Sequence, residues 1–137
     1  MSGRQASVFV CDDLLISLTG KFNALGIYTG DIVIPNEITA HQIVFVFQIE
    51  FDIDDPMSSA VLEVKFPGEE NPRQLAVPVG PLTPVEGRSR WIIRWPFPVQ
   101  MVHLRPGRIS TKVIHDKGEI DTTGIWIVSL APQSSLQ

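Results

Sequence analysis

The chain has 137 residues and a net charge of −4, and 44% of its residues are hydrophobic. This length fits a single domain, which we expect to span residues 1–137 with an ordered core at about 7–131. The hydrophobic share excludes a disordered chain, and no apolar run approaches the roughly 20 residues of a membrane span. Isoleucine and valine total 29 residues whereas alanine and leucine total 16, a bias that favours strands over helices.

The charges and the single cysteine restrict the partners and the compartment. No stretch holds the dense run of lysine and arginine that contacts with several phosphates require, so we do not expect a nucleic-acid partner. Cys11 cannot form an intramolecular disulfide, and the first residues lack the apolar stretch of a secretory signal. Both features favour residence in the cytoplasm.

Short segments rich in β-branched residues follow one another along the chain, separated by turn residues. The strands predicted from this pattern are, in chain order, residues 7–11, 21–28, 32–34, 42–51, 60–66, 73–79, 91–95, 108–116 and 119–130. Residues 60–66 are expected to pair with 73–79, and 108–116 with 119–130. The one helical candidate, residues 13–18, is too short to be favoured.

Residues 42–51 give the clearest strand pattern. Their odd positions, from Ile43 to Phe51, form a continuous apolar face. Their even positions change from Val44 and Val46 to Gln48 and Glu50. The second face of this strand is therefore expected to be covered only near its start.

Two prolines predict the position of a sheet edge. Pro96 and Pro98 lie two residues apart, so their missing N–H groups are on the same side of the strand. A central strand does not tolerate that loss of hydrogen bonds. The segment around residues 95–99 must therefore be an edge strand or leave the sheet there.

Eight or nine short strands without a convincing helix predict an all-β fold. The expected architecture is an antiparallel two-sheet β-sandwich, immunoglobulin-like in its broad layout, and a small barrel is the alternative.

Candidate metal sites are limited to two acidic clusters. Asp52, Asp54 and Asp55 follow the strand 42–51, but the spacing of a calcium loop is missing. The second cluster, at the tip of the last hairpin, contains His115, Asp116, Glu119 and Asp121. Cross-strand pairing there can bring His115 near Asp121, but no second histidine lies nearby. We favour a solvated strand end and a polar hairpin tip, and we expect no cofactor.

No catalytic motif is present in the sequence. Cys11 ends an apolar strand and precedes two carboxylates, which raise a thiol pKa and suppress the thiolate. Gly26 lies inside a predicted strand, where a bulge or close packing is the favoured reason. We therefore expect a protein that is not an enzyme.

Arginine and tryptophan gather next to the predicted sheet edge, and these are the residues most enriched at interface hot spots. The residues predicted to bind a partner are Arg90, Arg94, Trp95 and Phe97. In a regular strand Arg94 points away from Trp91 and Trp95, so the two residue types would serve opposite faces. The alternative is that the tryptophans fill the core and the arginines are solvated.

Two stretches resemble an uncharacterised bacterial family of small β-sandwich proteins. Residues 10–12 and 20–28 are similar to its opening strands, and residues 104–109 to the start of its closing strands. The family pattern often has tyrosine where Ile109 stands, so a tyrosine-corner hydrogen bond is not expected here. The resemblance implies the sandwich fold and no activity.

These observations predict a non-catalytic binding or structural module that docks a protein partner or associates with itself. The alternatives are a module that binds a small ligand or carbohydrate through aromatic side chains, and a metal-dependent enzyme built on the acidic clusters. The fold does not decide among them, because sandwiches host many unrelated functions.

Overall fold

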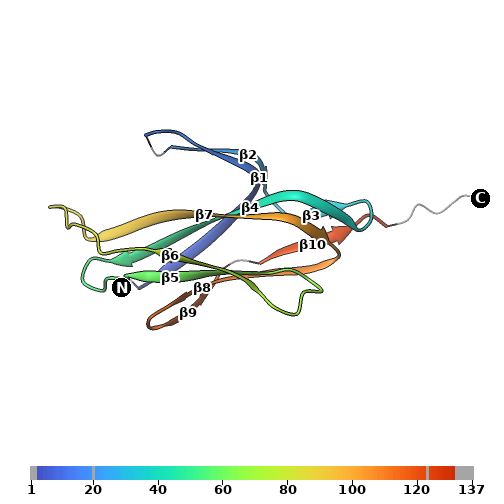
Figure 1. Ribbon diagram of the computed structural model, residues 1–137. Helices are drawn as coiled ribbons and strands as arrows, with labels where there is room; N and C mark the ends of the chain where they lie inside the picture. The colour runs from blue at the N-terminus through green and yellow to red at the C-terminus, as the bar shows by residue number, and fades with distance from the viewer. Residues whose placement is uncertain (1–2, 20, 123, 132–137) are drawn as a thin grey trace, which may run out of the picture.

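A computed structural model describes residues 3–19, 21–122 and 124–131, which form two β-sheets without a helix in these ranges (Figure 1). The four-stranded sheet has the order β2-β1-β4-β7, and the second sheet has the order β3-β10-β8-β5-β6, with β9 also paired to β8. The strands of the four-stranded sheet are β1 (Gln5–Ile16), β2 (Phe22–Tyr28), β4 (Ile38–Asp52) and β7 (Arg90–Leu104). Those of the second sheet are β3 (Ile32–Ile34), β5 (Ser59–Lys65), β6 (Arg73–Pro78), β8 (Gly107–His115), β9 (Gly118–Asp121) and β10 (Ile125–Ser129).

The all-β prediction is confirmed, and several strand limits differ from those expected. The predicted strand 119–130 is divided into β9 and β10, which both pair with β8. The buried Thr122 donates its backbone N–H to the Thr111 carbonyl oxygen at 3.0 Å, and the two threonine hydroxyls are hydrogen-bonded. The helical candidate at residues 13–18 begins as strand, since β1 continues to Ile16.

One strand pair departs from the antiparallel expectation. β3 lies between β2 and β4 in the sequence, yet it pairs in parallel with β10 in the second sheet. The chain therefore leaves the four-stranded sheet after β2 and returns to it at β4. A three-residue strand has too few side chains for its alternation to indicate this crossover.

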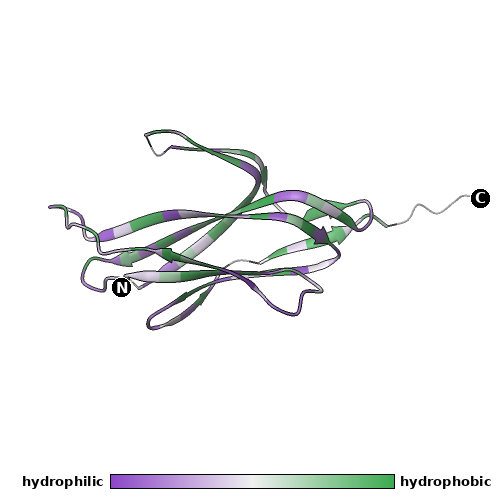
Figure 2. Ribbon diagram, viewed as in Figure 1, coloured by the Kyte–Doolittle hydropathy of each residue, from purple (hydrophilic) through white to green (hydrophobic). Residues whose placement is uncertain are grey.

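The main core takes its side chains from both sheets. Phe45 of β4 meets Phe66, which follows β5, in an edge-to-face contact with ring centroids 5.7 Å apart. The odd residues of β4 from Ile43 to Phe51 are buried in this core, as their alternation predicts. Hydrophobic and hydrophilic residues alternate along the strands in Figure 2.

A smaller core lies on the outer face of the four-stranded sheet. It contains the buried Cys11, Val44 and Val46, with Phe9, Leu14, Phe22 and Ala24 packed against them. Further along β4, Gln48 and Glu50 are only partly buried. The prediction that this face is covered only near its start is therefore confirmed.

The arm that covers this outer face is the distal part of the β1–β2 hairpin. β1 pairs with β4 only from Gln5 to Cys11, and beyond Asp13 it pairs with β2 alone. We call residues 13–19 and 21–25 the arm. In Figure 1 it rises from the four-stranded sheet and extends over β4 and β7.

Candidate functional site

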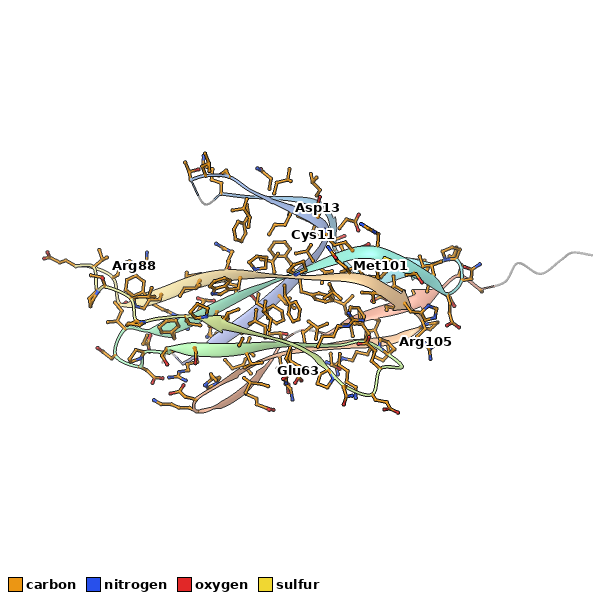
Figure 3. All side chains as sticks on the ribbon, in the orientation of Figure 1. Cys11, Asp13, Glu63, Arg88, Met101 and Arg105 are labelled. Atoms are coloured by element: carbon orange, nitrogen blue, oxygen red, sulfur yellow. The ribbon has the colours of Figure 1, made fainter. Side chains whose placement is uncertain are left out.

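A cleft lies between the arm and the outer face of β7. It has a volume of about 630 Å³ and is lined by Phe9, Lys21, Phe22, Asn23, Ala24 and Arg94. Phe22 and Ala24 are half-buried on the side of the arm that faces the sheet. In Figure 3, Cys11 and Asp13 are at the base of the arm.

Two cations line this cleft beside apolar side chains. Arg94 and Lys21 are exposed, and within the described chain neither forms an ion pair. Arg94 lies on β7 opposite Gln48 of β4, and Lys21 precedes β2. The cleft thus combines unpaired positive charge with the rings of Phe9 and Phe22.

The four residues predicted to bind a partner do not share one exposed surface. Phe97 is 8% exposed and belongs to the main core, and Trp95 packs against that core. Arg94 is exposed on the opposite face, as the strand alternation predicts. Arg90 contacts Asp52 at 2.9 Å and Glu50 at 3.7 Å, and it donates to the Gly3 carbonyl oxygen at 2.6 Å. The docking role of these four residues stays a prediction.

The sheet edge predicted from the prolines is confirmed. β7 is the last strand of its sheet and pairs only with β4 there, with Pro96 opposite Val46 and Pro98 opposite Val44. In an antiparallel ladder such alternate positions share one hydrogen-bonding direction, so both missing N–H groups face away from β4.

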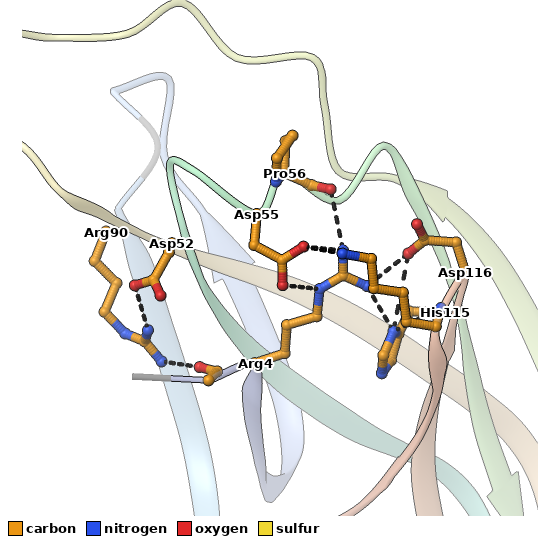
Figure 4. Close-up of polar contacts among 9 residues, drawn as sticks. Arg4, Asp52, Asp55, Pro56, Arg90, His115 and Asp116 are labelled. Carbon is orange, nitrogen blue, oxygen red and sulfur yellow. Dashed lines mark hydrogen bonds and ion pairs between the residues drawn. The ribbon is translucent and has the colours of Figure 1, made fainter. Parts of the chain in front are cut away.

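Arg4 connects the two acidic clusters, because it bonds to Asp55 of one and to Asp116 of the other. We call this arrangement the Arg4 clasp; it is made by Arg4, Asp55, Pro56, His115 and Asp116 (Figure 4). The Arg4 side chain is only 6% exposed. Its Nε and Nη2 donate to the two Asp55 carboxylate oxygens at 3.1 and 3.2 Å, and Nη2 also donates to the Pro56 carbonyl oxygen at 3.1 Å. Nη1 donates to Asp116 Oδ1 at 2.6 Å.

His115 accepts the remaining hydrogen bond of the clasp. Arg4 Nη1 lies 2.7 Å from His115 Nδ1, and a guanidinium can only donate, so Nδ1 is the acceptor and a neutral ring carries its proton on Nε2. Burial, and next the charge of Arg4, lower the pKa of His115. A hydrogen bond from Lys117, and next the charge of Arg4, lower the pKa of Asp55, and a hydrogen bond from Arg4 lowers the pKa of Asp116.

The carboxylates of the two acidic clusters are either bonded to cations or exposed. Asp55 bonds to Arg4 and Lys117, Asp52 bonds to Arg90, and Asp54 is exposed. The proposed approach of His115 to Asp121 is wrong, because Gly118 lies opposite His115 and Asp121 lies opposite Lys112. The described residues contain no group of three or more His, Cys, Asp or Glu side chains that could hold a metal ion.

The base of the arm is stabilised by Asp12. Tyr28 donates its hydroxyl hydrogen bond to Asp12 Oδ1 at 2.6 Å, and burial together with this bond raises the pKa of Tyr28 to about 12. Burial, and next the Asp12 charge, raise the pKa of the Cys11 thiol, so the predicted direction of that shift is confirmed.

Sequence patterns did not reveal the cleft or the clasp. The cleft depends on the bend of β1 away from β4, and Arg4 lies 51 residues before Asp55 and 112 residues before Asp116. The one available signal was the polar turn at residues 17–21 between two apolar segments, which is typical of a hairpin.

Comparisons with protein-family models and with curated proteins found no match to the chain. No helix in the described ranges has the length and apolar character needed to cross a membrane.

Proposed function

We propose that this protein is a non-catalytic module that associates with a second copy of itself through the free edge of β2. The observation that carries this proposal is the apolar surface of that edge. Leu25 and Ile27 on β2 are each 51% exposed, and Leu15 on β1 is 53% exposed. Clusters of exposed aliphatic side chains of this kind favour a protein interface.

The other outer strands carry features that oppose strand pairing. β7 has Pro96 and Pro98, β3 has only three residues, and β6 begins with Arg73 and ends with Pro78. β9, which among the described strands pairs only with β8, has four residues, of which two are acidic. β2 contains neither a proline nor a charged residue from Phe22 to Tyr28. Because unprotected edge strands pair readily with other strands, β2 is the edge best suited to a partner.

A second copy fits this edge because antiparallel pairing of two β2 strands is reciprocal. Each β2 would present the same row of backbone groups and the same aliphatic side chains to the other, around a two-fold axis. The positive φ of 67° at Gly26 interrupts the regular strand, so the ladder would form over residues 22–25. Leu25 would then lie at the end of the ladder, where its exposed side chain and that of Ile27 contribute to the buried apolar contact.

The experiment is a measurement of solution mass by light scattering over a range of protein concentrations. The wild-type protein is expected to reach twice the 15.2 kDa mass of the chain as concentration rises. Leu25→Lys should remain monomeric, because a lysine at this position would be buried against its copy in the dimer.

Val33→Lys is the matched control, since Val33 is also more than half exposed on an edge strand but lies on β3. This variant should dimerise like the wild type. A wild-type protein that stays monomeric at millimolar concentration, or equal loss of dimer in both variants, would contradict the proposal.

The remaining features of the chain support a structural rather than a catalytic role. The Cys11 thiol is buried, and the carboxylates of Asp52 and Asp55 are bonded to arginines. We also propose that the two sheets form a β-sandwich with an immunoglobulin-like layout, supported by the core that they share. Membership of the bacterial family that the sequence resembles and residence in the cytoplasm are part of the same proposal.

A further inference from the structure

The cleft beneath the arm has a composition that suits one chemical class of ligand. Its apolar lining comes from Phe9 of β1 and from Phe22 and Ala24 of the arm. Its polar lining comes from Lys21, Asn23 and Arg94. Its volume of about 630 Å³ lies within the range of small-molecule sites.

The two cations of the cleft differ from Arg4 and Arg90, which are paired with carboxylates. Arg4 bonds to Asp55 and Asp116, and Arg90 bonds to Asp52, whereas the described chain offers no carboxylate to Arg94 or Lys21. The chain as a whole is acidic, with a net charge of −4. Two unpaired cations beside aromatic rings therefore provide a local complement to an anion.

We propose that this cleft binds a small amphipathic carboxylate, with the carboxylate at Arg94 and Lys21 and the hydrocarbon against Phe9 and Phe22. The planar guanidinium of Arg94 matches the two oxygens of a carboxylate, and the ammonium of Lys21 adds a second charge. The apolar lining selects a ligand with an aliphatic or aromatic body over a fully polar anion.

This site and the surface proposed for self-association share the strand residues 22–24, but their side chains lie on opposite faces of the β1–β2 hairpin. The cleft lies between the arm and the sheet and is lined by Phe22 and Ala24. The self-association edge presents Leu25 and Ile27, which are exposed. Loss of ligand binding and loss of dimer formation can therefore be observed independently.

The test is an NMR titration of the wild-type protein with octanoate and with octanamide, its neutral analogue. Octanoate is expected to shift the amide signals of the cleft residues with a dissociation constant on the order of 1 mM. Octanamide should bind about tenfold more weakly, because it lacks the charge that Arg94 and Lys21 recognise. Equal binding of the two compounds, or no shift of cleft signals at about 20 mM octanoate, would overturn the proposal.

Variants that remove a positive charge test whether the carboxylate of the ligand binds at Arg94 and Lys21. Arg94→Gln and Lys21→Gln should each weaken octanoate binding several-fold and leave octanamide binding unchanged. The matched controls are Arg108→Gln and Lys65→Gln, which remove exposed cations outside the cleft. Equal weakening by the controls would show that net charge rather than the cleft determines binding, and would also overturn the proposal. Thermal unfolding of each variant verifies that it is folded.

Discussion

At the scale of single residues, Gly26 determines how the arm is joined to the sheet. Its φ is +67°, and a Cβ atom at this position would lie 2.3 Å from Asp12 Oδ2. The Asp12 carboxylate needs that space to accept the hydrogen bond of Tyr28. The sequence prediction of close packing at Gly26 is thus confirmed, and the neighbour involved is now identified.

Gly26→Ala is expected to lower the free energy of unfolding by about 1–3 kcal/mol, because alanine at positive φ is strained and its methyl group displaces Asp12. Urea denaturation measures this change. Gly30→Ala is the control, since nothing lies within 4 Å of a Cβ atom there. A loss of stability in Gly30→Ala as large as in Gly26→Ala would contradict this explanation.

At the scale of elements, the Arg4 clasp connects the start of β1 with the β4–β5 turn and with the β8–β9 hairpin tip (Figure 4). The arginine is nearly buried, so its bonds to Asp55 and Asp116 offset the cost of removing its charge from water. His115 completes the arrangement only while its Nδ1 is free to accept. The clasp is therefore sensitive to pH.

The free energy of unfolding should fall as the pH is lowered from 7 through 6.5, the ordinary pKa of histidine. The pKa of His115 is lower in the folded protein, so the unfolded chain takes up the proton first and is favoured at acidic pH. The charged groups around the ring are Arg4, Asp116, Asp55 and Lys117. A second loss should occur below about pH 3.8, since the pKa values of Asp55 and Asp116 are also lowered.

Chemical denaturation of the wild type and of His115→Gln across this pH range measures the contribution of the histidine. The variant should show a shallower decrease between pH 7 and 5, because it lacks the titrating ring. His41→Gln, at an exposed position of β4, serves as the control and should follow the wild type. Parallel curves for His115→Gln and the wild type would rule out the histidine as the cause.

At the scale of the whole molecule, the two edge strands of the four-stranded sheet, β2 and β7, differ in how well they are protected against pairing with another strand. The β7 end carries Pro96 and Pro98, and the β2 end carries exposed Leu25 and Ile27. A protein with one protected and one free edge can form a closed dimer, whereas two free edges allow open chains. In the assembly that we propose, the prolines therefore prevent pairing through β7, so that association stops at a dimer.

Replacing both prolines, Pro96→Ala and Pro98→Ala, should convert the expected dimer into larger assemblies, because both positions regain an N–H group that faces away from β4. Light scattering at increasing protein concentration measures the mass. Pro35→Ala, in the exposed segment before β4, is the control and should leave the mass unchanged. A double variant with the mass of the wild type would show that the prolines do not protect this edge.

Local patterns predicted much of the fold. The alternation from Ile43 to Phe51 predicted the buried face of β4, and the change from Val46 to Gln48 predicted where its second face loses its cover. Pro96 and Pro98 predicted the edge position of β7. These features follow from the two-residue period of a strand and from the hydrogen bonds that a proline lacks.

The sequence by itself therefore determined the all-β class, the inward faces of the long strands and one edge of the four-stranded sheet. Only the tertiary structure decided that β1 leaves β4 at the arm, that β3 pairs in parallel with β10, and that Arg94 and Lys21 line one cleft. It also brought Arg4 to Asp55 and Asp116 across most of the chain. The reason is that alternation and turn residues act between neighbours in sequence, whereas these contacts join residues that only the packing of two sheets brings together.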